Sequence, residues 1–281
     1  MKIRANAKIN LFLDVLGKRR DGYHNIKTVF QEISLSDDIF IEEIKGDADT
    51  IKVFCDDPSI PTDEKNLVHK ATSLIKKLFG IKKGVEIKIR KRIPVGAGLG
   101  GGSSDAAAVL SGLNKLWDLK LSKKHLAKIG KKIGADVPFF IYGGRCLGEG
   151  IGDIITPLKF KKNQWYVLVM PPFGIQTKSV YSRLSSASLK AKRSGKLAES
   201  QKIDTVCPQF NVLESVVIPQ YPEIKKIKNE LVKNGAVFSL MSGSGSCVFG
   251  LVKNKDDGER IKNCMRKGGY AVWLVKGVET D

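Results

Sequence analysis

The chain opens on a strict alternation of apolar and polar residues. Apolar side chains occupy every odd position of the first segment, namely Ile3, Ala5, Ala7, Ile9, Leu11, Leu13 and Val15. A period of two predicts a half-buried β-strand, because successive side chains of a strand point to opposite faces. Asn6, Lys8 and Asn10 therefore share the face that points away from the apolar side chains.

Strands and helices follow one another through the N-terminal half. Apolar runs predict strands at about residues 28–35, 39–44, 51–55 and 85–90. Apolar residues at helical spacing predict an amphipathic helix over residues 67–78, between the last two strands. A further helix is expected to start at Ser122 and to stop at Gly134.

The C-terminal half has a different pattern of apolar and polar residues. The pattern predicts strands at residues 165–170 and 271–275, a strand–turn–strand over 237–252, and helices that end at Gly235 and cover 256–267. Residues 185–205 are polar and poorly periodic, which fits either a loop or an exposed helix. Because strands and helices do not alternate regularly, we expect an α+β protein of two domains, residues 1–158 and 159–281.

Composition narrows the class of protein. The 281 residues are 42% hydrophobic and 27% charged, as in soluble globular proteins. No apolar run approaches the roughly 20 residues that span a bilayer, and no cleavage site follows the first strand, so we expect a cytoplasmic protein. The cysteines and histidines lack metal-ligand spacing, which predicts no structural metal site. The formal net charge of +19 fits either an anionic ligand with good solubility or a nucleic-acid partner.

A glycine-rich segment carries the strongest chemical signal. Five of the seven residues from Gly96 to Gly102 are glycine, and a helix-forming run begins at Asp105. A main chain without Cβ atoms can approach a ligand closely, and the start of a helix presents N–H groups and a positive dipole end to a phosphate. The candidate phosphate-binding residues are Pro94, Val95, Gly96, Ala97, Gly98, Leu99, Gly100, Gly101, Gly102, Ser103 and Ser104.

Other phosphate-binding motifs match the glycines less well. The G-x-G-x-x-G spacing of a dinucleotide fold is present, but no acidic residue ends a following strand at the usual distance. No Lys-Ser/Thr pair follows the last glycine as in a Walker A loop, and the protein-kinase motifs are missing from the sequence. A flexible turn remains the alternative. A second turn, Ser242 to Ser246, fits either a plain hairpin or a backbone wall against the same phosphates.

Three separated segments together resemble the GHMP kinase superfamily of small-molecule kinases. They are Ala7-Lys8-Ile9-Asn10-Leu11, the Pro94–Asp105 segment, and Met241 to Gly245. Asp21-Gly22-Tyr23-His24, Gly134 to Phe139 and Gly148 to Gly152 are similar to one branch of that superfamily, and the resemblance covers essentially the whole chain. It implies an N-terminal domain like domain 2 of ribosomal protein S5 and a ferredoxin-like C-terminal domain.

The resemblance also implies an activity. Kinases of that branch use ATP to phosphorylate the 2-hydroxyl of 4-(cytidine 5'-diphospho)-2-C-methyl-D-erythritol, giving the 2-phosphate and ADP in the non-mevalonate route to isoprenoid precursors. We therefore expect ATP as co-substrate and Mg²⁺ bridging its phosphates, with no protein ligand assigned to the metal. The expected partners are small molecules, without nucleic acid or membrane, and the expected assembly is a monomer or weak homodimer. The adenine pocket is expected near Asn66, Leu67 and Val68.

Two residues match the catalytic pair of the family. Asp136 would accept the proton of the substrate hydroxyl, and Lys8 would lower the pKa of that carboxylate and offset the developing charge. Considered without the resemblance, Asp136 before Val-Pro is more typical of a helix N-cap. Lys8 by itself is more typical of the protein surface.

The substrate-binding candidates also come from the resemblance. Asn10 would hydrogen-bond the substrate, Tyr23 and His24 would contact the cytosine, and Tyr181 with the preceding Thr177 would supply a second aromatic position. By itself, Tyr-His after Asp-Gly is more typical of a half-buried turn. Two alternative functions remain. The first is a kinase that acts on mevalonate, homoserine or a sugar, and the second is a basic RNA-binding protein without enzymatic activity.

Overall fold

The computed structural model describes residues 1–45, 48–159, 163–184 and 209–279, and the chain forms two compact units. The first unit consists of Met1–Ala7, Leu35–Pro94 and Gly100–Gly143, and the second of Lys8–Ser34, Val95–Leu99 and Gly144–Asp281. The two long strands β1 (Lys2–Lys18) and β2 (His24–Ile44) contribute residues to both units. The expected domain boundary after residue 158 stays a prediction.

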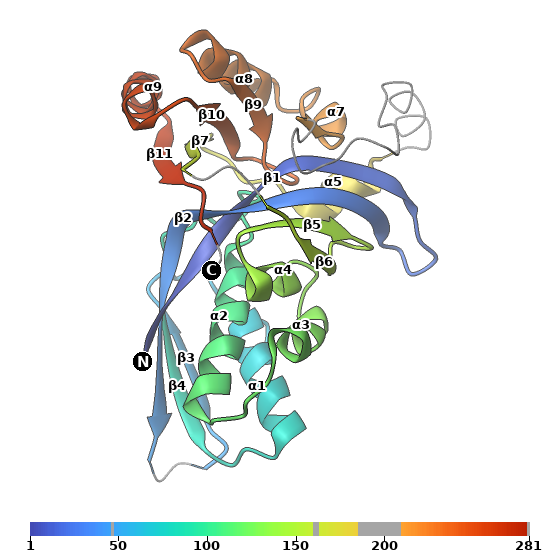
Figure 1. Cartoon of the computed structure of the whole chain (residues 1–281), viewed down its shortest axis with the longest axis vertical. Coiled ribbons are helices and arrows are strands. Elements are labelled where there is room, and N and C mark those ends of the chain that lie inside the picture. Colours follow the sequence, from blue (N-terminus) through green and yellow to red (C-terminus); the bar gives the residue numbers. More distant parts are fainter. Residues whose placement is uncertain (46–47, 160–162, 185–208, 280–281) are drawn as a thin grey trace. The chain divides into compact units, whose positions relative to one another are not determined.

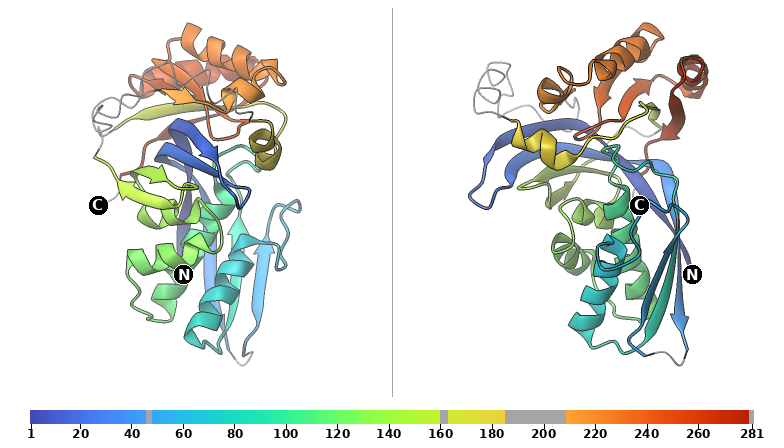
Figure 2. Two further views of the ribbon diagram at one scale, coloured as in Figure 1. Left: turned by 90° about the vertical axis from the view of Figure 1, so that its right-hand side faces the viewer. Right: turned by 180° about the vertical axis from the view of Figure 1, so that it is seen from behind.

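The first unit is a sheet with helices on one face. β3 (Ile51–Cys55) runs parallel to β4 (Gly84–Arg90), and β4 is antiparallel to residues 38–44 of β2. A parallel pair needs a long crossover, which α1 (Leu67–Phe79) provides. α1 and α2 (Gly101–Leu116) cover one face of this sheet, and α3 (Lys123–Lys131) and α4 (Val137–Tyr142) pack against α2 (Figures 1 and 2).

Apolar periodicity explains why these elements pack together. α1 begins where the Asn66 side chain accepts the N–H of Val68 and ends at Gly80, whose φ is 63°. Its buried face meets apolar residues of the strands and of α2 in one core, including Val68, Ala71, Ile75, Ile39, Ile41, Ile87, Val109 and Leu110. Burial of each large aliphatic side chain stabilises the fold by about 1.5–3 kcal/mol. The predicted helix over residues 67–78 is confirmed.

β2 differs from the expectation of two strands at residues 28–35 and 39–44. It is one strand from His24 to Ile44, and Asp37 and Asp38 lie within it at 0% and 1% exposure. The polar residues suggested a break because an isolated buried carboxylate is costly. Here each carboxylate has a partner, since Asp37 pairs with Lys91 and Asp38 with Arg92. Long-range pairing therefore keeps the strand continuous.

The second unit contains a four-stranded antiparallel sheet in the order β11-β7-β10-β9. The strands are β7 (Trp165–Met170), β9 (Phe238–Met241), β10 (Val248–Val252) and β11 (Ala271–Lys276). α8 (Pro222–Lys233) and α9 (Lys255–Lys267) pack on this sheet (Figure 1). The chain order β7-α8-β9-β10-α9-β11 is the split βαβ arrangement, which confirms the expected ferredoxin-like fold.

The remaining strands of the second unit pair with the long strands or with each other. Residues 28–31 of β2 pair with β5 (Arg145–Glu149), which pairs with β6 (Ile154–Pro157). β8 (Phe210–Asn211) runs parallel to β1 at Phe12 and Leu13, and the short helices are α5 (Thr177–Ser182) and α7 (Glu214–Val217). The polar 185–205 stretch lies outside the described residues. Across the described ranges, no helix is both long and apolar enough to cross a membrane.

Candidate active site

The glycine-rich stretch contributes to both units, with Val95–Leu99 in the second and Gly100–Ser104 in the first. Gly96, Gly98 and Gly100 have φ of 67°, 73° and 74°, which residues with a side chain rarely adopt. α2 begins at Gly101, four residues before the expected start at Asp105, and its N-cap Gly100 makes no side-chain cap hydrogen bond. Gly101 and Gly102 therefore belong to the first helical turn, whereas Gly96, Gly98 and Gly100 lie before it.

The second Gly/Ser turn, residues 242–246, joins β9 to β10, which confirms the predicted hairpin. It packs on the first glycines within the second unit. The Ser242 hydroxyl donates to the carbonyl oxygen of Gly98 at 3.0 Å, and the N–H of Cys247 donates to the carbonyl of Ala97 at 3.2 Å. A Cβ on Gly98 would lie 2.1 Å from the Ser242 carbonyl oxygen, so the two turns meet main chain to main chain.

Lys8 lies buried on β1 and not at the surface, at 4% exposure. Its Nζ donates to the Gly98 carbonyl oxygen and to Asn10 Oδ1, both at 2.7 Å. The Asn10 amide donates in turn to the Thr28 hydroxyl at 2.8 Å. β1 was expected to be half-buried, but both of its faces are buried from Ala7 to Leu13, because the glycine-rich turns cover the polar face in the second unit. The surface interpretation of Lys8 is wrong.

The candidate cytosine-binding side chains gather in the second unit. The rings of His24 and Tyr181 have centroids 5.4 Å apart, and the Thr177 hydroxyl lies 2.8 Å from that of Ser244 in the second turn. Burial, with a contribution from the Lys18 charge, lowers the pKa of His24, so a neutral ring is favoured at neutral pH. The Tyr23 side chain is 59% exposed and makes an open aromatic surface at the turn.

The first unit brings the end of the glycine-rich stretch to the Gly134-Ala135-Asp136 segment. A Cβ on Gly134 would lie 3.5 Å from Ser103 Oγ and 4.0 Å from Leu67 Cδ1. A Cβ on Gly102 would lie 3.7 Å from the same Leu67 atom. The candidate phosphate, adenine and catalytic segments of this unit are therefore neighbours, although they are far apart in sequence.

Asp136 occupies the N-cap position of α4, but its side chain makes no cap hydrogen bond. The N-cap interpretation therefore does not account for its carboxylate. Ser104 differs from Ser103, because the Ser104 hydroxyl donates to the Asn6 carbonyl at 2.6 Å and its N–H donates to the Gly100 carbonyl at 2.9 Å. Both donors of Ser104 are thus used within the first unit.

A buried charged cluster next to α2 was missed by sequence reasoning. Lys91 Nζ lies 2.5 Å from Asp37 and 2.9 Å from Asp105. The available signal was the presence of aspartates inside otherwise apolar segments, at Asp37 in a strand and at Asp105 before a run of alanines. Within the described residues, no group of three or more His, Cys, Asp or Glu side chains is arranged to hold a metal ion.

Two models of known protein families match this chain. The family model "GHMP kinases N terminal domain" matches residues 66–144, which include the whole glycine-rich segment and Asp136. The model "GHMP kinases C terminal" matches residues 188–271, which include the second turn. The chain therefore belongs to the GHMP kinases.

Individual relatives show which kind of GHMP kinase this chain is similar to. Proteins from Geobacillus thermodenitrificans and Clostridioides difficile are 44% and 45% identical over 98% and 99% of this chain, and over 96% and 97% of their own lengths. Both are named 4-diphosphocytidyl-2-C-methyl-D-erythritol kinase. A crystal structure of 4-(cytidine 5'-diphospho)-2C-methyl-D-erythritol kinase is 32% identical, with a TM-score of 0.80 over 99% of this chain and 100% of that one. A homoserine kinase from Cytophaga hutchinsonii shares the fold at 21% identity, with a TM-score of 0.77 over 99% of this chain and 94% of its own.

Proposed function

We propose that this protein transfers the γ-phosphoryl group of ATP to the 2-hydroxyl of 4-(cytidine 5'-diphospho)-2-C-methyl-D-erythritol, giving the 2-phosphate and ADP in the non-mevalonate route to isoprenoid precursors. The similarity to relatives of that name at 44% identity over 98% of the chain carries the proposal. Within each unit, a candidate catalytic segment lies against the glycine-rich stretch, which supports it. A non-enzymatic RNA-binding role does not require candidate catalytic segments next to the glycine-rich stretch.

In the proposal, the main chain from Gly96 to Ser103 holds the ATP phosphates. The fit rests on the positive φ of Gly96, Gly98 and Gly100, which brings bare backbone to the surface of the turn. The first N–H groups of α2 have no carbonyl four residues earlier within the helix, so they are available to an anion. The N–H of Ser104 donates to the carbonyl oxygen of Gly100, four residues earlier, at 2.9 Å.

Asp136 acts as the base and Lys8 as the stabilising cation in the proposed mechanism. A tertiary hydroxyl is a weak nucleophile, and a positioned carboxylate that takes its proton contributes roughly 10²–10⁴-fold in rate. The Lys8 ammonium is held by the Gly98 carbonyl and by Asn10, so its charge is fixed before substrate binds. A pre-positioned charge at a transferring phosphoryl group contributes on the order of 10²–10³-fold.

Asn10 is proposed to hydrogen-bond the substrate, and it also positions Lys8, since its oxygen accepts from Lys8 Nζ and its amide donates to the Thr28 hydroxyl. Tyr23, His24 and Tyr181 are proposed to bind the cytosine. Aromatic stacking on a base is worth about 1–3 kcal/mol. The neutral His24 ring can donate or accept a hydrogen bond at the base edge.

ATP is the proposed co-substrate, and Mg²⁺ is proposed to arrive with its phosphates. The described residues offer no acidic cluster for a protein-held metal ion, so no step is assigned to one. Bound to the phosphates, the cation neutralises part of their charge. The Ser103 hydroxyl is the side-chain oxygen of the turn that could approach it.

An acceptor panel tests the function. The purified protein is given ATP with Mg²⁺ and one acceptor at a time: the cytidine-diphosphate substrate, mevalonate, homoserine or galactose, with ADP release measured by a coupled assay. We expect turnover with the cytidine compound and at least about 100-fold lower kcat/KM with the others, because they have no base to bind. Preference for another acceptor would refute the proposed substrate, and ADP release with none would refute the kinase.

A further inference from the structure

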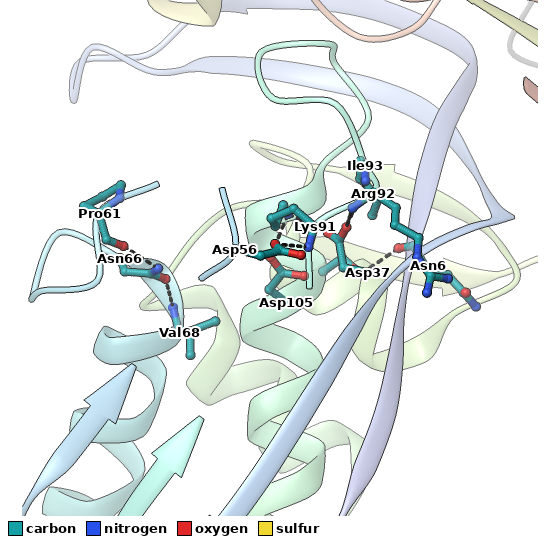
Figure 3. A network of polar contacts seen from close by, with 11 residues as sticks. Asn6, Asp37, Asp56, Pro61, Asn66, Val68, Lys91, Arg92, Ile93 and Asp105 are labelled. Carbon is teal, nitrogen blue, oxygen red and sulfur yellow. Dashed lines mark hydrogen bonds and ion pairs between the residues drawn. The ribbon is translucent and has the colours of Figure 1, made fainter. Parts of the chain in front are cut away.

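Three charged side chains from three separate segments meet inside the first unit (Figure 3). Asp37 lies on β2, Lys91 directly follows β4, and Asp105 lies on α2. Lys91 Nζ is 2.5 Å from Asp37 Oδ2 and 2.9 Å from Asp105 Oδ2, and the three side chains are 0–7% exposed. Two carboxylates and one ammonium leave a net charge of −1 when all are ionised, and such a buried excess is costly.

The two carboxylates have unequal surroundings. Asp37 Oδ1 accepts the N–H groups of Arg92 and Ile93 at 2.5 and 2.8 Å, in addition to the Lys91 contact on Oδ2. Asp105 accepts a hydrogen bond from Lys91 on Oδ2, whereas its Oδ1 is buried with no hydrogen-bond partner in the part of the chain that the structure describes. Burial raises the pKa of Asp105 to about 7; the Lys91 charge lowers it and the Asp37 charge adds to the rise. Asp105 therefore exchanges a proton near neutral pH.

The cluster lies directly against the first turn of α2. A Cβ on Gly101, the first residue of that helix, would lie 3.2 Å from Lys91 Nζ and 3.1 Å from Ile93 Cγ2. Asp105 is four residues later, so Gly101 and Asp105 share one face of the helix. Lys91 therefore supports the helix from Gly101 to Asp105, and a side chain at position 101 would displace it.

We propose that this cluster positions the first turn of α2 for anion binding, and that loss of a proton from Asp105 weakens that binding. The inference rests on the proposed function, because the anion is the ATP triphosphate. The N–H groups and dipole at the start of the helix attract phosphate, and a negative charge one turn inside opposes that attraction. With Asp105 protonated, the cluster is neutral and the opposition disappears.

Other charged groups around Asp105 have their own partners or lie away from it. Asp38 pairs with Arg92 at 2.8 Å and with Lys2 at 3.3 Å. Asp56 accepts the main-chain N–H of Lys91 at 2.8 Å. α1 packs on α2 and buries Val68, Ala71, Thr72, Ile75 and Lys76, while His69 is half-buried and Lys70 exposed. The Lys76 ammonium donates to the Lys83 carbonyl oxygen at 2.7 Å and lies 3.8 Å from Asp49. Asp37 and Lys91 are thus the charges that act most directly on Asp105.

The test measures the affinity of the full-length protein for ATP with Mg²⁺ by calorimetry, between about pH 6 and about pH 8.5. For the wild type we expect Kd to rise about tenfold across this range as Asp105 ionises. Asp105→Asn has the shape of the protonated side chain and keeps an oxygen for Lys91, so its Kd should change only as far as ionisation of ATP itself changes it. Ionisation of ATP itself affects both proteins equally, and the difference between them isolates Asp105.

Asp38→Asn is the matched control. Asp38, on β2, is a buried and paired aspartate like Asp105, but its partners are Arg92 and Lys2. It should keep the wild-type pH dependence. A wild-type Kd that rises no more than ionisation of ATP alone requires overturns the inference even if no variant folds, and so do parallel profiles of the wild type and Asp105→Asn. Wild-type protein that binds no ATP would refute the proposed function and this inference together, which distinguishes the two failures.

Discussion

Replacement of Gly98 by alanine tests the contact between the two glycine-containing turns. The new Cβ would lie 2.1 Å from the carbonyl oxygen of Ser242 and 3.0 Å from that of Gly245, at a residue whose φ is 73°. Both neighbours are main-chain atoms, so no side-chain rotation can relieve the overlap. The turn at residues 242–246 or the glycine-rich stretch must move.

The expected cost has two parts. A left-handed φ costs a residue with a side chain about 1–2 kcal/mol. The overlap is more than about 1 Å inside the ordinary carbon–oxygen contact of about 3.3 Å. Forcing extra atoms into a packed site costs typically about 1–3 kcal/mol. Together the substitution should destabilise the protein by about 2–5 kcal/mol, or lower Tm by roughly 5–15 °C.

Gly269→Ala is the control, because Gly269 has a φ of 85° and no heavy atom within 4 Å of the built Cβ. It should cost only the conformational part, about 1–2 kcal/mol. Thermal unfolding compares the two variants, and the KM for ATP and kcat are measured below both melting temperatures. Gly98→Ala should also reduce kcat, because the Gly98 carbonyl holds the Lys8 ammonium. Equal losses of Tm in the two variants would refute the packing argument.

Three further predictions concern individual side chains. Asp136→Asn should lower kcat by about 10²–10⁴-fold and leave the KM for ATP within about twofold, and an active variant would reject Asp136 as the base. Tyr23→Ala should leave Tm nearly unchanged, since the side chain is 59% exposed, but should raise the KM for the cytidine substrate at least about fivefold and far more than that for ATP. Equal rises in both KM values would count against stacking. Because burial raises the folded-state pKa of Asp105 to about 7, above its ordinary value of 3.8, its proton stabilises the native state at low pH and this stability is lost as pH rises through about 7. Urea unfolding should therefore show the wild type losing on the order of 3 kcal/mol relative to Asp105→Asn between about pH 5 and about pH 8, and parallel curves would contradict this.

Local patterns predicted the elements that depend on local forces. The helix from Leu67 needed only its apolar face, the Asn66 cap and the glycine that ends it, and all of these are short-range features. The hairpin at residues 242–246 was likewise predicted by a Gly/Ser turn between apolar runs. The glycine-rich segment and the matches at Lys8 and Asp136 identified the family, because short motifs in the same order and spacing resemble those of its members.

Predictions were wrong where distant residues changed the local balance. Polar residues 36–38 suggested a break in β2, but Lys91 and Arg92 neutralise the aspartates and the strand continues. The glycines before Asp105 suggested a loop, but α2 starts at Gly101, where Lys91 and Ile93 occupy the space of a side chain. In both places residues 91–93, directly after β4, decided the outcome.

The amino-acid sequence alone determined the α+β class, because periodicity is a property of neighbouring residues. The family followed from the resemblance of separated motifs, and phosphate binding by residues 94–104 stays a prediction. Tertiary structure decided that Lys8 is buried and held by Gly98, that the two Gly/Ser turns touch, and that Asp105 shares Lys91 with Asp37. Such contacts depend on strand register and helix packing, which join positions tens of residues apart. Burial then changes the chemistry, since it raises the pKa of Asp105, a carboxylate that would be ionised in water at neutral pH, to about 7.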